Sequence, residues 1–147
     1  MKIVPFTDDH ADDVVQWIYE APYDRYDTAA DADLVDLLTK AELRSGVRAV
    51  VEDEALIGYF NFVKRDDEIH LGLGLRPELT GRGLGSTFVE AGLTYARDKW
   101  APARFRLWVA AFNVRAILVY ERAGFVAVRS ACRLSDRLEF VEMESQA

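Results

Sequence analysis

Three glycines alternate through the junction between a predicted strand and a predicted helix, and this junction limits the folds open to the chain. The segment reads LGLRPELTGRGLGSTF, residues 73–88. Pro77 ends the strand because it has no N–H to donate to a neighbouring strand. Gly81, Gly83 and Gly85 remove side chains where the helix starts, so backbone N–H groups at its positive end stand open to an anion. The junction predicts an α/β domain with a pyrophosphate site on a strand-to-helix turn.

The rest of the chain alternates between short strand patterns and amphipathic helices. Strands are predicted at Lys2–Phe6, Val47–Glu52, Ala55–Arg65, Glu68–Leu75, Arg104–Ala110, Phe125–Ser130 and Leu138–Met143. Helices are predicted from the N-cap Thr7 to Ile18, and at Ala30–Leu43, Gly83–Trp100 and Val114–Ala123. The order βααβββαβαββ predicts a single mixed α/β domain over residues 1–147, with four helices and a mostly antiparallel sheet of about seven strands. In the first two helices, Val14, Trp17 and Ile18, and then Leu34, Leu37, Leu38 and Ala41, are expected to be buried.

Composition excludes several classes of function. The net charge of −7 argues against a nucleic-acid surface. No apolar run is long enough for a membrane helix, and no secretory signal is recognisable at the start. Cys132 is the one cysteine, which excludes an internal disulfide; it is expected to be a buried structural thiol in a cytoplasmic protein. His10 and His70 lie far apart without zinc spacing, so no metal site is predicted.

Three phosphate-binding patterns compete for the glycine loop. A P-loop needs lysine before its Ser or Thr, but Gly85 precedes Ser86. A dinucleotide fingerprint needs a glycine where Ser86 stands, and a βαβ unit around it. The segment Thr80–Gly85 resembles the Q/R-x-x-G-x-G/A loop of the GNAT acyltransferases at every position except the first, where Thr80 replaces the long polar residue.

A second motif strengthens this resemblance. The segment NVRAILVYERAGF, Asn113 to Phe125, is similar to the N-x-x-A-x-x-x-Y-x-x-x-G-F signature of the same family. Independently of the family, Asn113 suits a helix N-cap and Gly124 the position just after a helix end. The resemblance covers nearly the whole chain. It implies the GNAT fold, with a splay between the fourth and fifth strands, and acetyl-coenzyme A as the cofactor.

The resemblance also implies roles for individual residues. The loop and second motif would bind the cofactor through Gly81, Arg82, Gly83, Gly85, Ser86, Asn113 and Tyr120, and the backbone of Leu73 and Leu75 would pair with its pantetheine arm. Tyr120 would act as the acid that protonates the leaving thiolate, although a tyrosine at this helix position is also an ordinary core aromatic. The general base stays open between Glu68, His70 and a water relay, because Glu68 and His70 alternate onto one strand face that solvent alone would explain.

By resemblance, the segment between the first two helices walls the acceptor groove. It carries aromatic and acidic side chains together, of which Tyr23, Asp24, Tyr26 and Asp27 are the predicted substrate-binding residues. Aromatic faces beside carboxylates suit an ammonium group. The acceptor is therefore expected to be a small-molecule or peptide amine, although packing of a helix elbow explains the aromatics nearly as well.

These observations predict an N-acetyltransferase that moves an acetyl group from acetyl-coenzyme A directly to a primary amine. The protein is expected to be a monomer or a homodimer. The alternative is a catalytically idle domain that binds coenzyme A as a sensor or partner-binding module. A more distant alternative is a nucleotide-binding domain without acyl chemistry.

Overall fold

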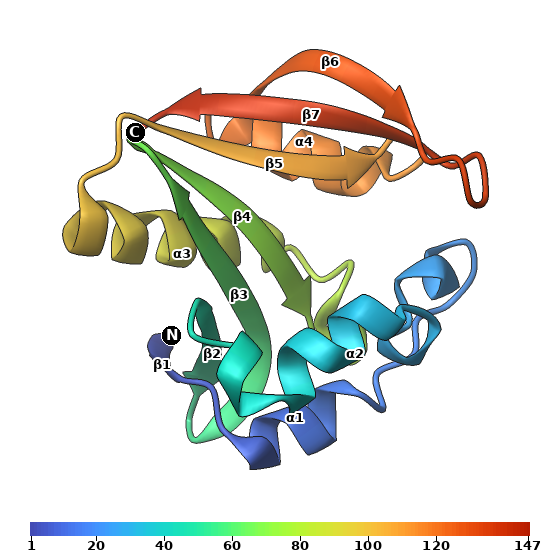
Figure 1. Ribbon diagram of the computed structural model, residues 1–147, viewed down its shortest axis with the longest axis vertical. Helices are drawn as coiled ribbons and strands as arrows, with labels where there is room; N and C mark the ends of the chain where they lie inside the picture. Colours follow the sequence, from blue (N-terminus) through green and yellow to red (C-terminus); the bar gives the residue numbers. More distant parts are fainter. The chain divides into compact units, whose positions relative to one another are not determined.

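The computed structural model describes residues 1–147 and contains a seven-stranded sheet with the order β1-β2-β3-β4-β5-β7-β6 (Figure 1). The strands are β1 (Lys2–Pro5), β2 (Val47–Glu52), β3 (Ala55–Arg65), β4 (Glu68–Leu75), β5 (Arg104–Ala110), β6 (Val126–Cys132) and β7 (Glu139–Gln146). The α-helices are α1 (Asp8–Val14), α2 (Ala32–Thr39), α3 (Gly85–Trp100) and α4 (Val114–Arg122). The β4–β5 pair is parallel, whereas β1–β2, β2–β3, β5–β7 and β6–β7 are antiparallel. The predicted element order and mixed sheet are confirmed.

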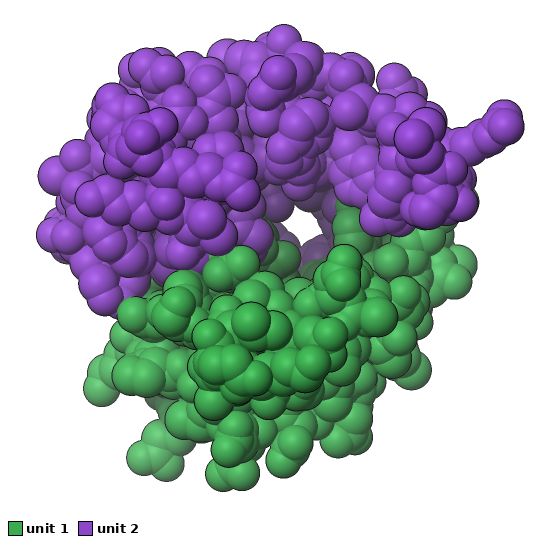
Figure 2. Space-filling model, viewed as in Figure 1, with its two compact units in different colours: residues 1–61, 73–80 green, residues 62–72, 81–147 purple.

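The chain divides into two compact units, coloured separately in Figure 2. The first unit comprises residues 1–61 and 73–80, and the second comprises residues 62–72 and 81–147. Strands β3 and β4 contribute residues to both units. No helix of the chain is long and apolar enough to span a membrane.

The first unit is built on a core under α1 and α2. Thr7 caps α1 as predicted, because its side chain accepts a hydrogen bond from the backbone N–H of His10. The helix ends at Val14 rather than Ile18, and its last turn tightens into a bond from the Trp17 N–H to the Val14 carbonyl. This tighter turn places Trp17 in the core and leaves Ile18 73% exposed, so the predicted burial of Ile18 is wrong.

Helix α2 is shorter than predicted at both ends. Asp31 caps it by accepting a 3.1 Å hydrogen bond from the Leu34 N–H, which moves the start to Ala32. Lys40 then adopts an extended backbone, and residues 41–43 form a separate 3₁₀ turn. Leu38 is fully buried, as the amphipathic pattern predicts. Ala41 lies beyond the break and is exposed, contrary to prediction.

The second unit places α3 and α4 against each other, with α4 behind β5 and β7 in the view of Figure 1. Its most deeply buried large side chains are Ile69, Phe88, Leu93, Phe105, Phe125 and Met143. Phe105 and Leu107 of β5 are buried, and Arg104 and Arg106 alternate with them onto the opposite face. That opposite face is therefore the charged one.

The parallel pairing of β4 with β5 runs from Glu68↔Arg104 to Leu71↔Leu107. Strand β4 continues to Leu75 and β5 to Ala110. The shared register thus stops short of both strand ends, as the predicted splay between these strands requires.

Strand β6 lies at the edge of the sheet, and all of its residues are exposed. Its pairing with β7 contains a register shift between Ala127 and Arg129, the mark of a β-bulge. Cys132 closes this strand and is exposed, so the prediction of a buried thiol is wrong. Strand β6 is covered on neither face, and the pattern of residues in the sequence does not reveal this exposure.

Candidate active site

The glycine loop contains two residues that require glycine for backbone reasons. Gly81 and Gly83 have φ angles of +74° and +77°, in the left-handed region that side chains disfavour. A Cβ atom on Gly83 would meet no heavy atom within 4 Å, so the space beside this residue is open. The helix that follows begins at Gly85 rather than at the predicted Gly83, with Leu84 at the N-cap.

Gly85 has a different role. A Cβ atom here would lie 3.1 Å from Cγ2 of Val119, a residue of α4. The missing side chain therefore lets α3 and α4 approach each other closely, which is a packing function. Ser86, the next residue, is partly exposed in the first turn of α3.

Two arginines supply positive charge at the loop. Arg82 lies within it and is exposed. Arg115, which sequence reasoning missed, extends from the first turn of α4 so that its Nη1 lies 3.0 Å from where a Cβ of Gly81 would be. Its place inside the second motif, two residues after Asn113, is the signal that could have identified it. The loop thus combines glycine backbone, a helix start and guanidinium groups, a donor set that fits a pyrophosphate.

Thr80, the residue that departs from the family pattern, uses its hydroxyl locally. The hydroxyl donates a 2.7 Å hydrogen bond to the carbonyl of Pro77, across the 3₁₀ turn Pro77–Leu79. The hydroxyl therefore stabilises the turn that precedes the glycines. Arg82 and Arg115 are then the cationic side chains of the loop in the second unit.

The second motif forms α4 as predicted. Asn113 caps the helix by accepting a 3.1 Å hydrogen bond from the Ala116 N–H. Gly124 follows the helix with a φ of +100°, which reverses the chain into Phe125. Tyr120 is buried, and its ring packs edge-on to Phe125 with centroids 6.0 Å apart.

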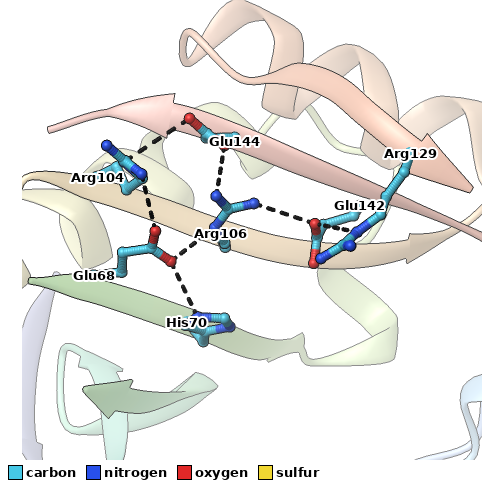
Figure 3. A network of polar contacts seen from close by, with 7 residues as sticks. All are labelled: Glu68, His70, Arg104, Arg106, Arg129, Glu142 and Glu144. Carbon is cyan, nitrogen blue, oxygen red and sulfur yellow. Dashed lines mark hydrogen bonds and ion pairs between the residues drawn. The ribbon is translucent and has the colours of Figure 1, made fainter. Parts of the chain in front are cut away.

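Glu68 lies in a network of seven charged or titratable side chains on β4, β5, β6 and β7 (Figure 3). Its Oε2 accepts a 2.7 Å hydrogen bond from Nε of Arg106, and its Oε1 accepts a 3.1 Å bond from Nη1 of Arg104. The hydrogen bond from Arg106, followed by its charge and the bond from Arg104, holds the pKa of Glu68 below its usual value.

His70 belongs to the same network, since its Nε2 lies 3.4 Å from Oε2 of Glu68. The structure thus brings together the two residues that were predicted as alternative bases. The arginines were not predicted as part of the site. Arg104 and Arg106 alternate on β5 as Glu142 and Glu144 do on β7, and this matched alternation of opposite charge is the signal that could have paired them.

The predicted acceptor segment forms two 3₁₀ turns, Tyr23–Tyr26 and Thr28–Ala30. Asp24 is exposed, whereas Tyr23 and Tyr26 are partly buried. Asp27 accepts a 2.7 Å hydrogen bond from the backbone N–H of Tyr19. Of the two predicted acceptor carboxylates, Asp24 is therefore exposed, whereas Asp27 stabilises the fold of the segment itself.

Leu73 and Leu75, the predicted backbone contacts of the cofactor, are partly exposed near the end of β4. The carbonyl of Leu75 accepts a 2.8 Å hydrogen bond from the hydroxyl of Tyr19, and burial raises the pKa of that tyrosine. Trp17, by contrast, lies in the core and donates from Nε1 to Asp13, so it is not part of a groove wall.

Comparison with known proteins supports the resemblance noted in the sequence. The sequence profile of the Acetyltransferase (GNAT) family matches residues 11–125. A mycothiol acetyltransferase of Streptomyces coelicolor is 41% identical over 78 residues, which are 50% of this chain and 25% of that protein. A mycothiol acetyltransferase of Salinispora arenicola is 43% identical over 53 residues, 36% of this chain and 17% of that protein. The chain thus spans about a quarter or less of the length of these two relatives.

Solved structures share the fold over almost the whole chain. A spermidine N-acetyltransferase of Vibrio cholerae, solved as a chimera with a second enzyme, has a TM-score of 0.76 at 19% identity, covering 99% of this chain and 96% of that chain. A GNAT-family acetyltransferase of Bacillus anthracis also has a TM-score of 0.76, at 14% identity, covering 98% and 93% of the two chains. The predicted fold is confirmed by these similarities.

Proposed function

Because the chain belongs to the GNAT family of acetyltransferases, we propose that it transfers an acetyl group from acetyl-coenzyme A directly to a primary amine. The observation that carries the proposal is the family profile over residues 11–125, which includes both the glycine loop and the Asn113–Phe125 motif. Both motifs lie on the elements that the chemistry needs, a strand-to-helix turn and a capped helix.

Cofactor binding is assigned to the loop from Gly81 to Ser86. Its backbone N–H groups at the start of α3 would bind the pyrophosphate, and Arg82 and Arg115 would add charge-assisted hydrogen bonds. The bound cofactor supplies the acetyl group as a thioester. Gly83 keeps the loop open to the phosphates because nothing occupies the space at its missing side chain.

Tyr120 is assigned the acid role. A phenol has a pKa of about 10 and a thiol one of about 8.5, so proton donation to the thiolate needs a tyrosine held close to the departing sulfur. Helix α4 fixes the ring in place through its burial and its contact with Phe125. Asn113 supports the same helix by capping it, so its contribution to the site would be through α4.

The acceptor is proposed to be a cationic amine of a small molecule or peptide. Asp24 is exposed in the 3₁₀ turn that also carries Tyr23 and Tyr26, so the segment presents a carboxylate beside aromatic side chains. The similar structure from Vibrio cholerae is a spermidine N-acetyltransferase, which makes polyamines a first class to test. A cytoplasmic location, where acetyl-coenzyme A is available, is part of the proposal.

The test is release of free thiol from acetyl-coenzyme A in the presence of separate amine classes: polyamines, amino acids, amino sugars and peptides. Acetylation of one class, confirmed by the product mass, supports the proposal. Calorimetric binding of coenzyme A without thiol release on any amine would favour the idle binding module instead. Tight binding of ATP or NAD without binding of coenzyme A would favour a nucleotide-binding domain.

A further inference from the structure

The charged network of Figure 3 distinguishes the carboxylate of Glu68 from the imidazole of His70. The sequence alone offers both groups as candidates for the general base. Glu68 and His70 lie two residues apart on β4, and in the register with β5 they stand beside Arg104 and Arg106. Both therefore emerge on the charged face of the sheet. Their polar partners, however, are very different.

Glu68 is occupied on both oxygens. Arg106 donates to Oε2 at 2.7 Å and Arg104 donates to Oε1 at 3.1 Å, so the carboxylate is held ionised by two guanidinium groups. A carboxylate that binds its proton weakly is a poor general base for the amine. The fixed position of the Glu68 carboxylate, in contrast, suits it to orient the side chain of His70.

Arg106 makes that position rigid. Besides Glu68, its guanidinium contacts Glu142 at 3.2 Å and Glu144 at 3.0 Å, both on β7. Arg129 of β6 contacts Glu142 at 2.8 Å from the other side. Glu68 is thus tied across the sheet to strands that are themselves paired along their length.

His70 has a single polar partner in the structure, Oε2 of Glu68, which faces its Nε2 at 3.4 Å. A carboxylate at this nitrogen favours the tautomer that carries the proton on Nε2, which leaves the lone pair of Nδ1 available. The imidazole is partly exposed, with 27% of its side-chain surface accessible. A neutral imidazole with a free lone pair is the usual form of a general base near neutral pH.

We infer, on the basis of the proposed function, that His70 accepts the proton of the acceptor amine at Nδ1, and that Glu68 is a positioning residue that holds the imidazole through Nε2. The amine reacts in its neutral form: its nitrogen lone pair forms a bond to the acetyl carbonyl carbon, and the carbon–sulfur bond of the thioester breaks. The N–H proton moves to Nδ1 of His70, and the thiolate takes its proton from Tyr120. The negative charge of Glu68 then stabilises the imidazolium.

The charged groups that surround the pair are Arg106 and Arg104 on β5 and Glu144 on β7. Glu144 provides the matched control, because it contacts the same two arginines as Glu68 but is not a partner of His70. A loss caused only by a disturbed network would appear in a Glu144 variant as well. A loss that depends on orienting His70 would not.

The experiment measures kcat and KM against pH for His70→Gln, Glu68→Ala, Glu68→Gln and Glu144→Ala, on the amine that the wild type acetylates. His70→Gln should lower kcat by about 10² to 10⁴ and abolish the acidic limb of the profile. Glu68→Ala should lower kcat about 10- to 100-fold with the limb retained. Glu68→Gln should restore most of that activity, because its amide oxygen can still face Nε2 at the same place. Glu144→Ala should resemble the wild type.

Two results would overturn the inference. In the first, Glu68→Gln is as inactive as Glu68→Ala, and both variants lack the acidic limb of the pH profile. In the second, His70→Gln keeps the wild-type rate and the wild-type pH profile. Nitrogen NMR of neutral His70 adds a readout that needs no activity. The Nε2–H tautomer should dominate in the wild type and in Glu144→Ala and lose its dominance in Glu68→Ala; the same tautomer in all three would contradict the positioning role. If the wild type acetylates no amine, the proposed function fails, while the NMR result still decides whether Glu68 orients His70.

Discussion

The carboxylate of Asp27 accepts a 2.7 Å hydrogen bond from the backbone N–H of Tyr19, eight residues earlier in the chain. This bond closes the segment between α1 and α2 into a loop, and the Tyr19 hydroxyl anchors the loop to the Leu75 carbonyl at the end of β4. The predicted acceptor carboxylates therefore differ: Asp27 supports the loop, and Asp24 is exposed on it.

The acceptor prediction follows from this difference. Asp24→Asn removes an exposed charge, and we expect it to raise the KM for a cationic acceptor roughly two- to fivefold, as befits an interaction of about 0.5–1 kcal/mol. The KM for acetyl-coenzyme A should not change. Rising ionic strength should mimic the substitution in steady-state assays, because salt screens an exposed charge. An acceptor KM that is insensitive to both would remove Asp24 from the site.

Substitutions at Asp27 should separate loop closure from charge. Asp27→Ala removes the bond to Tyr19 and should lower the free energy of unfolding by about 1 kcal/mol. Asp27→Asn keeps an acceptor oxygen and should lie close to the wild type in chemical denaturation. Equal stability of the two variants would show that the bond contributes nothing to the loop.

Substitutions at two glycines of the loop should have different effects, one on coenzyme A binding and the other on stability. Gly83→Asn adds a side chain to the open space, at a φ that asparagine tolerates, and should weaken coenzyme A binding at least roughly tenfold with little change in stability. Gly85→Val would press against Val119 and should lower the free energy of unfolding by about 1–3 kcal/mol. Calorimetry and thermal melts measure the two effects. Wild-type affinity in a folded Gly83→Asn variant would exclude the loop as the phosphate site.

Tyr120→Phe tests the acid role with the least disturbance of packing. The ring and its edge-on contact with Phe125 remain, and the hydroxyl alone is lost. We expect turnover to fall by roughly one to three orders of magnitude, with coenzyme A affinity nearly unchanged. Unchanged turnover on an identified acceptor would make Tyr120 an ordinary core aromatic.

Glu68 should make stability depend on acid pH. Its pKa in the folded protein lies below the ordinary value of 4.5, chiefly because of the hydrogen bond from Arg106. The unfolded chain therefore binds a proton at this residue more readily, so the stabilisation is fully present above about pH 5 and is lost as the pH falls through the folded pKa. Denaturation between pH 7 and pH 3 should show a steeper acid loss for the wild type than for Glu68→Gln. Parallel curves would contradict the assignment.

The sequence predicted the strands well because hydrophobic alternation and turn residues act over only a few neighbouring residues. The bounds of β2, β3, β4 and β5 match the prediction. Between β2 and β3, Asp53 and Glu54 both have positive φ angles, which is the tight two-residue turn expected for a hairpin. The hydrophobic alternation and the turn agree, so few alternatives remain.

The errors arise where long-range packing decides. Lys40 breaks α2 although the sequence favours a longer helix, and Ile18 leaves the core because the chain tightens after α1. The pairing of Arg106 with Glu144 depends on the register between β5 and β7. The alternation of charge on both strands suggests this pairing, but the pattern within one strand does not set the register. Gly85 matched the family motif, yet its close contact is with Val119, a residue on another helix.

The bulge in β6 bears on how the folded protein avoids self-association through its sheet edge. An exposed edge strand can template the addition of a strand from another molecule, the first step of aggregation. The register shift between Ala127 and Arg129 interrupts the straight row of backbone groups that such pairing needs. Arg129 also places a charge, 66% exposed, in the middle of the strand. The irregular edge thus protects a surface that carries exposed Val126 and Val128 from becoming the nucleus of an aggregate.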